Sequence, residues 1–145
     1  TDLYKYGKAG SKTLTFHVDG LTDDTQTFNL SHGDAFTVVT TKAANGAVNG
    51  VAFTSQPIVE IRDEDGNLVS TGPQSRQIVT ISASAGAVFE GTKTATASAG
   101  VATFAGADLK LTGTAQNYTM TYSISSPRAI SWSQGLTLSR VPPLS

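Results

Sequence analysis

Apolar and polar residues alternate along much of this chain, and turn-forming residues interrupt the alternation roughly every 8–12 residues. The clearest case is residues 57–69, where single polar residues separate the apolar ones and the run Asp65-Gly66-Asn67 follows. A period of two residues places successive side chains on opposite faces of a strand. Gly and Asn tolerate the positive φ that a tight reversal requires. The segment therefore predicts a hairpin, with the rest of residues 51–145 packed around it as strands.

The remainder of the chain supports an all-β fold. No stretch repeats apolar residues at helical spacing over three turns, so little helix is expected. Many short strands separated by turns favour an antiparallel β-sandwich over a parallel α/β sheet. Further strands are predicted at residues 13–18, 25–30, 35–41, 77–82, 100–104, 117–124 and 130–138.

The first fifty residues are predicted to differ from the rest. Residues 1–12 have little pattern and predict an irregular arm, whereas the three strands within residues 13–41 follow one another with short turns and predict a β meander. Residues 42–50, rich in Ala, Asn and Gly, are the predicted internal boundary. We therefore divide the chain into an attachment or assembly segment at 1–50 and a sandwich domain at 51–145.

Composition narrows the functional classes. The net charge is −1 and the ten Lys and Arg residues are scattered, whereas nucleic-acid binding needs clustered basic residues. No apolar segment reaches the ~18 residues needed to cross a bilayer, so membrane insertion is not expected. The chain has no Cys, which excludes disulfides, thiol catalysis and thiolate metal sites.

Three short motifs suggest a known family. The run from Pro57 to Asn67 is a strand that ends in an Asp/Gly/Asn turn, and Gly100-Val101-Ala102-Thr103-Phe104 is a compact strand. A Leu-rich segment, Leu109 to Ala115, then precedes the strand led by Tyr118. In this order, residues 51–125 resemble the bacterial Ig-like repeats of surface adhesins and phage virion proteins.

The resemblance implies an Ig-like antiparallel β-sandwich whose roles are display, spacing and binding, without catalysis. It also implies a tyrosine corner at Tyr118, whose phenol would bond to nearby backbone. Residues 1–50 do not fit the family, and the segment that holds Trp132 fits it only as a last strand.

Two polar motifs were weighed as chemical sites. The run from Asp63 to Asn67 offers several oxygens to a calcium ion, but its alternative is a hairpin turn whose acidic residues face water. Ser31, His32 and Asp34 invite comparison with a hydrolase triad, yet sequence neighbours rarely achieve that geometry. No catalytic residue, metal site or cofactor is predicted, and the protein is not expected to be an enzyme.

The main functional hypothesis is a structural surface protein. It would be a virion protein (a capsid decoration or tail accessory) or a bacterial surface module for assembly or adhesion, and so would reside on a virion or cell surface. Its partners would be capsid, tail or surface-layer subunits, or a further copy of this chain. Leu3, Tyr4 and Tyr6 of the arm are the predicted partner-binding residues.

The alternative is a carbohydrate-binding module that recognises a cell-surface glycan. Such modules stack sugar rings on exposed aromatic side chains, and Trp132 is the candidate residue for this role. The competing interpretation of Trp132 is core packing, because it shares a strand face with Ile130.

Overall fold

A computed structural model describes residues 7–141, and nearly all of its regular structure is β-strand. The single helix among the described residues is one short 3-10 turn, Pro73–Arg76, so no described helix is long and apolar enough to span a bilayer. The strands are β1 Gly10–Phe16, β2 Asp24–Leu30, β3 Thr37–Lys42, β4 Ile58–Arg62, β5 Ile78–Ala83, β6 Ala87–Glu90, β7 Thr94–Thr96, β8 Val101–Thr103, β9 Lys110–Gly113, β10 Asn117–Ile124 and β11 Ile130–Thr137.

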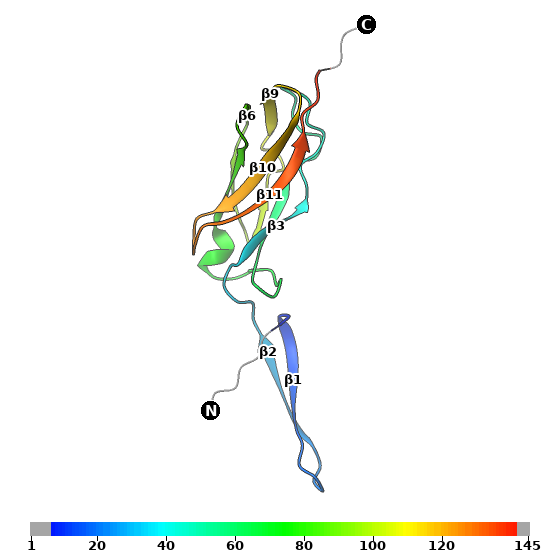
Figure 1. The fold of residues 1–145 in the computed structure, drawn as a ribbon. Coiled ribbons are helices and arrows are strands. Elements are labelled where there is room, and N and C mark those ends of the chain that lie inside the picture. The colour runs from blue at the N-terminus through cyan, green and yellow to red at the C-terminus, as the bar shows by residue number, and fades with distance from the viewer. Residues whose placement is uncertain (1–6, 142–145) are drawn as a thin grey trace.

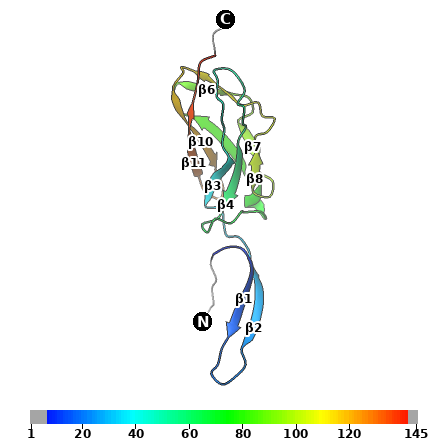
Figure 2. The same cartoon turned by 90° about the vertical axis from the view of Figure 1, so that its right-hand side faces the viewer.

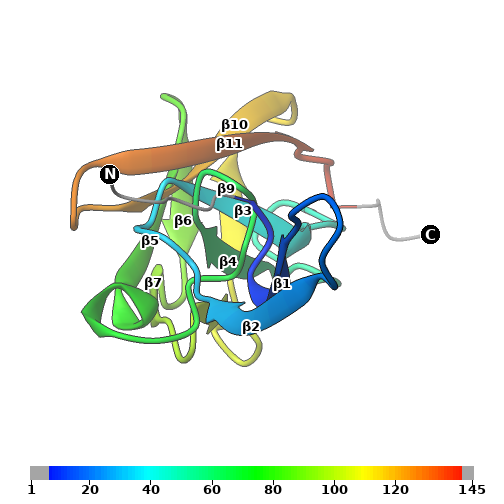
Figure 3. The same ribbon diagram turned by 90° about the horizontal axis from the view of Figure 1, so that it is seen from below.

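The main body is a sandwich of antiparallel sheets. One layer has the strand order β11-β10-β5-β7 and the facing layer has the order β3-β4-β8, while β6 and β9 form an additional pair. The view along the long axis in Figure 3 shows the β10–β11 layer lying across the β3–β4 layer. The prediction of an all-β antiparallel sandwich is confirmed.

The core lies between the layers and follows the alternation of the sequence. Val59 and Ile61 of β4 are fully buried, whereas the residues on either side of them are only partly so. Along β10, every second residue from Tyr118 to Ile124 is likewise buried. The phenol of Tyr118 donates a hydrogen bond of 2.8 Å to the carbonyl of Thr114, four residues upstream, so the tyrosine corner is present.

The hairpin predicted at residues 57–69 forms, but its return strand is short. The return segment pairs with β4 only through an isolated bridge between Leu68 and Arg62. The turn is closed by a 2.9 Å hydrogen bond from the Asp63 amide to the Asn67 carbonyl. The main partners of β4 are instead β3 and β8. The pairing that builds the sandwich is therefore long-range.

The predicted three-strand meander at residues 13–41 is wrong in its third strand. β1 and β2 pair only with each other among the described strands, whereas β3 pairs with β4, with Val38 opposite Ile61. The independent N-terminal unit consequently ends at Leu30, and residues 37–42 belong to the sandwich. Figures 1 and 2 show the β1–β2 hairpin projecting from one pole of the sandwich, while β11 leads the chain out at the opposite pole.

Candidate interaction arm and its anchor

The most unusual feature of the molecule is the projecting hairpin, which we call the arm and define as residues 7–31. Its two strands pair along their full length, from Gly10 opposite Leu30 to Phe16 opposite Asp24. An isolated two-stranded hairpin is at best marginally stable in water. The arm has the extended form of a structural element, but among residues 7–141 no other strand pairs with it.

The arm has one apolar face and one hydroxyl-rich face, because residues opposite each other across an antiparallel pair point to the same side. The apolar face is formed by Leu14, Phe16, Phe28 and Leu30, with Lys12, Gln26 and Asp24 beside them. The other face consists of Ser11, Thr13, Thr15, Thr25, Thr27 and Asn29. Such an amphipathic pattern is typical of a sheet with one buried side.

The apolar side chains of the arm are nevertheless accessible. Phe16 is 50% exposed, and two apolar residues of the loop at its tip, Val18 and Leu21, are 59% and 69% exposed. His17, which lies between Phe16 and Val18 in the chain, contacts the carboxylates of Asp19 and Asp23. The tip therefore combines large exposed apolar groups with a small charged cluster.

The arm is held to the sandwich by the turn at Asp63–Asn67. The Asn67 side chain bonds to the backbone on both sides of Lys8, accepting from the Ala9 amide at 2.8 Å and donating to the Gly7 carbonyl at 2.9 Å. Lys8 in turn donates from Nζ to the Asp65 carbonyl at 2.6 Å. The acidic turn that suggested calcium in the sequence thus serves as the anchor of the arm.

Asp63 is the centre of this anchor. It is 5% exposed, and its carboxylate accepts from the Gly33 amide at 2.7 Å, the Asn67 amide at 2.8 Å and the Asn67 side-chain amide at 2.9 Å. Desolvation alone would raise the pKa of Asp63, but these hydrogen bonds favour the carboxylate and hold its pKa below the usual range. Gly33 lies in the segment that joins β2 to β3, so the bond ties that segment to the sandwich.

Acid is therefore expected to release the anchor. Because the pKa of Asp63 is lower in the folded protein than in the unfolded chain, its contribution to stability is complete above the unfolded value of about 3.9 and is lost as the pH falls through the folded value. The amide resonances of Gly33 and Asn67 should shift together in an NMR titration below pH 4 and stay constant from pH 5 to 7. A shift of both resonances centred at or above pH 4, where an ordinary aspartate titrates, would contradict the assignment.

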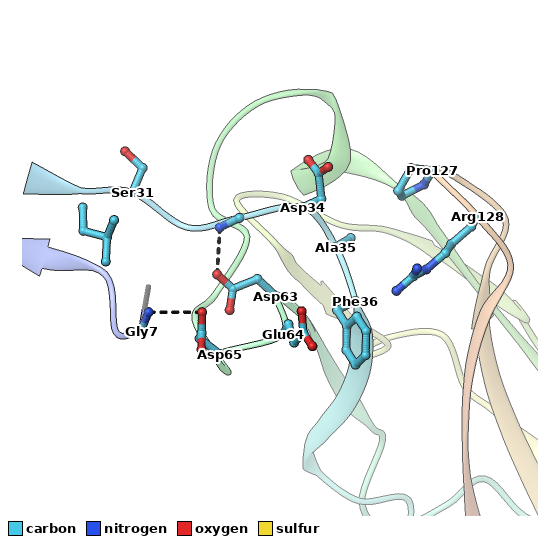
Figure 4. A pocket seen from close by; sticks show the side chains of 12 residues that line it. Gly7, Ser31, Asp34, Ala35, Phe36, Asp63, Glu64, Asp65, Pro127 and Arg128 are labelled. Atoms are coloured by element: carbon cyan, nitrogen blue, oxygen red, sulfur yellow. Dashed lines mark hydrogen bonds between the residues drawn. The ribbon is translucent and has the colours of Figure 1, made fainter. Parts of the chain in front are cut away.

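A cavity of about 550 Å³ opens between the arm and the sandwich. Figure 4 shows Asp63 and Asp65 directed toward the arm and Arg128 on the opposite wall. The Arg128 guanidinium lies 5.0 Å from the ring centroid of Phe36. Asp34 and Glu64 add two more carboxylates to the lining. Among residues 7–141, no three His, Asp or Glu side chains are placed to hold a metal ion.

The structure describes some of the site residues predicted from the sequence and not others. Leu3, Tyr4 and Tyr6 lie outside the described residues, so their role stays a prediction. The ring of His32 is hydrogen-bonded through Nε2 to the hydroxyl of Thr71 at 2.8 Å. This bond ties the segment between β2 and β3 to the sandwich. Trp132 is half-buried against the core, with its ring centroid 6.0 Å from that of Tyr122, and its glycan role also stays a prediction.

Sequence reasoning did not single out the apolar face of the arm. It chose Leu3, Tyr4 and Tyr6, which lie outside the described residues, and treated residues 13–41 as a self-sufficient sheet, whereas the structure leaves the apolar face of β1 and β2 partly exposed. The signal was present, because Leu14, Phe16 and Val18 alternate cleanly and Phe28 and Leu30 do the same. What the sequence could not reveal was that, in the described part of the chain, the β1–β2 hairpin is joined by no third strand.

Comparison with known proteins gives a likeness at the level of the fold. No protein-family model matches the chain, and no curated protein sequence matches it. Among solved structures, it is similar to a glycosyl hydrolase family 2 member from Bacteroides cellulosilyticus, determined from microfluidic crystals, with 15% identity, a TM-score of 0.51, and coverage of 88% of this chain and 17% of that one. A glycosyl hydrolase family 2 member from Bacteroides cellulosilyticus DSM 14838 gives 15% identity, a TM-score of 0.50, and coverage of 86% and 18%. The chain spans less than a fifth of these structures, and what it shares with them is a β-sandwich fold.

Proposed function

We propose that the protein is a non-catalytic interaction module, in which the sandwich is a rigid base and the arm is the attachment site for a protein partner. The observation that carries the proposal is the apolar face of the arm, on which Phe16 is 50% exposed and Leu14, Phe28 and Leu30 are partly exposed. An exposed apolar surface on a protein commonly marks an interaction site. The outer edges of β1 and β2, which pair with no other described strand, add backbone donors and acceptors that a partner strand can bond.

The anchor supports this function because it fixes the direction of the arm. Bonds from Asp63, Asp65 and Asn67 reach residues on both sides of the hairpin, namely Gly7, Ala9 and Gly33. A binding element held in place loses less conformational entropy on association than a free one. The arm is therefore held in one orientation before its partner binds.

The resemblance of residues 51–125 to Ig-like repeats supports a location for the module. We propose that it is displayed on a virion or a bacterial surface, where it mediates assembly or adhesion. Its partners are then capsid, tail or surface-layer subunits. The near-neutral net charge of −1 suits contacts made through apolar patches and strand edges.

The proposal predicts that one face of the arm is essential for assembly and the other is not. Leu14→Asp places a carboxylate on the apolar face and should lower partner binding about a hundredfold, because burial of an unpaired charge is strongly unfavourable. Thr15→Asp puts the same group on the hydroxyl-rich face of the same strand and should have little effect. Tagged chains expressed in the native source and separated by size would report the fraction that enters a larger assembly.

Equal incorporation of the two variants would overturn the proposal. Loss of incorporation by both variants would also count against it, since the effect would then come from disruption of the hairpin pairing. A wild-type level for Thr15→Asp with a loss for Leu14→Asp is the expected outcome.

Carbohydrate binding is the second candidate function. Both solved structures that share the fold carry the name of a glycosyl hydrolase family, which supports a carbohydrate context more than a virion one. Within this chain, Trp132 is the half-exposed aromatic residue that a sugar ring could reach from the rim of β11.

This second function predicts that Trp132 governs glycan retention. Trp132→Ala should weaken retention in polysaccharide-containing gels about tenfold, the loss of one stacking contact. Phe36→Ala, which removes an exposed aromatic ring elsewhere, is the matched control and should migrate like the unmodified protein. Circular dichroism would verify that both variants remain folded. Unchanged retention of Trp132→Ala across a panel of surface polysaccharides would remove this candidate.

A further inference from the structure

The arm repeats the hairpin that closes the sandwich, β10–β11. In both hairpins a large apolar residue of the first strand faces a glutamine of the second: Leu14 pairs with Gln26, and Met120 pairs with Gln134. The flanking pairs correspond in the same register, Lys12–Phe28 with Tyr118–Leu136 and Phe16–Asp24 with Tyr122–Trp132. The second strands run on into matching sequences, Phe28-Asn29-Leu30-Ser31 and Leu136-Thr137-Leu138-Ser139.

The corresponding positions differ sharply in their exposure. Tyr122 is completely buried in the sandwich, whereas its counterpart Phe16 is 50% exposed. Two residues further along the chain, Ile124 is 3% exposed and Val18, just past the end of β1, is 59% exposed. The arm therefore has the apolar pattern of a closing hairpin without the core that such a hairpin closes.

The β10–β11 hairpin shows what that core must supply. β10 pairs along its outer edge with β5, from Met120 opposite Ala83 to Ser123 opposite Thr80. On the inner face, Gln134 donates to the Ala44 carbonyl at 3.1 Å and accepts from the Ala44 amide at 3.3 Å. Among residues 7–141 the arm has no equivalent of either contact, because β1 pairs with β2 alone.

We propose that the arm is the closing hairpin of a second β-sandwich of the same kind, and that its partner is such a sandwich with the β10–β11 position open. A β5-like strand of the partner pairs with the free edge of β1, and the partner's core covers Leu14, Phe16, Phe28 and Leu30. This inference rests on the proposed function and names the partner that the arm fits.

The places where the arm departs from β10–β11 are compatible with this role. Lys12 stands where Tyr118 stands, and the Tyr118 hydroxyl donates to two backbone carbonyls, those of Thr114 at 2.8 Å and Gly86 at 3.4 Å. A lysine ammonium is also a donor, so the same carbonyls of a partner sandwich can hold it. Asp24 corresponds to the half-buried Trp132, a rim position where a carboxylate can remain in contact with water.

The geometry of the whole molecule agrees with a head-to-tail arrangement. The arm projects from one pole of the sandwich, and β11 leads out at the other, as Figure 1 shows. Ser139 and Arg140 leave β11 at the same point in the repeat as Ser31 and His32 leave β2. A partner sandwich that takes up the arm would therefore lie beyond the pole from which the arm projects, away from the end at which β11 leads out.

An extended protein would test the inference directly. In it, residues 33–117 of the chain are placed before residues 12–145, so that Lys12 follows residue 117 as Tyr118 does in the natural sequence. The added segment is a sandwich without its closing hairpin, and the arm occurs only once. Backbone amides of residues 14–17 and 26–30 should become at least about a hundredfold more protected from hydrogen exchange than in the 145-residue chain.

Two variants of the extended protein make the result decisive. Phe16→Asp should abolish the added protection, whereas Thr15→Asp, on the opposite face, should retain it. Lys12→Tyr restores the corner tyrosine and should increase protection further if the arm occupies the β10 position. Arm amides that exchange as fast as in the 145-residue chain, in both the extended protein and its Lys12→Tyr variant, would overturn the inference.

Failure of this inference is distinguishable from failure of the proposed function. If native assembly depends on Leu14 while the arm of the extended protein remains unprotected, the arm binds a partner of another kind. If neither result is obtained, the arm is not an attachment site at all.

Discussion

Ile61→Ala is expected to lower the free energy of unfolding by about 3 kcal/mol, the cost of removing three buried carbons and leaving a cavity. Ile61 is fully buried and lies in β4, the central strand of the β3-β4-β8 layer. Its neighbours on both sides fix the backbone, because its amide donates to the Gly100 carbonyl at 2.8 Å and its carbonyl accepts from the Val69 amide at 2.9 Å. The surrounding strands consequently cannot collapse into the vacated space.

Ile78→Ala provides the matched control for this prediction. Ile78 begins β5 and is 56% exposed, so the same chemical deletion should cost less than about 1 kcal/mol there. The chain has a single tryptophan, Trp132, whose packing beside Tyr122 makes its fluorescence a suitable signal for denaturant unfolding. Equal losses for the two variants would show that the buried layer is not where the structure places it.

Asp63→Ala is expected to release the arm and to destabilise the sandwich by about 2–3 kcal/mol. The substitution removes the charged acceptor of the Gly33 and Asn67 amides, and a hydrogen bond to a charged group contributes about 1.5–3 kcal/mol. Nitrogen-15 relaxation should then show that residues 10–30 reorient independently of the sandwich. In the unmodified protein they should tumble with it.

Asp65→Ala is the control for the release of the arm. The carboxylate of Asp65 accepts one exposed bond of 3.2 Å, from the amide of Gly7, so its loss should leave the arm ordered. If Asp65→Ala frees the arm as fully as Asp63→Ala, the anchor depends on total negative charge in the turn and not on the buried carboxylate.

Much of the sandwich could be predicted from local patterns, because alternation records which side of a strand is buried. The alternation in residues 57–62 predicts a strand with one buried face, and in the structure Val59 and Ile61 form that face. Tyr118 occupies the corner that the Ig-like resemblance implies. Strand partners were harder to predict, since pairing is a long-range property. The break at residues 32–34 was interpreted as a turn from β2 into a third meander strand. In the structure, the amide of Gly33 donates a hydrogen bond to the carboxylate of Asp63, and β3 pairs with β4.

The proposed binding surface could be predicted only in part. An attachment role for the first segment followed from its mismatch with the rest of the chain, but the face that serves it depends on which strands remain uncovered. That information lies in a comparison internal to the chain, between residues 12–31 and 118–139. The repeat is hidden because polar Lys12 and Asp24 replace two aromatic residues, Tyr118 and Trp132, so residue identity is low while the alternation and pairing register are kept.

The placement of the Asp63–Asn67 turn has a mechanical consequence. If the arm and the far end of β11 are pulled apart, the load reaches the sandwich through residues 31–36 and through the side-chain bonds that Asp63 and Asn67 make to the base of the hairpin. These few side-chain hydrogen bonds should rupture at a lower force than the one needed to shear the hydrogen-bonded strands of the sheets apart. The joint would then pivot and absorb extension while the β-sandwich remained intact.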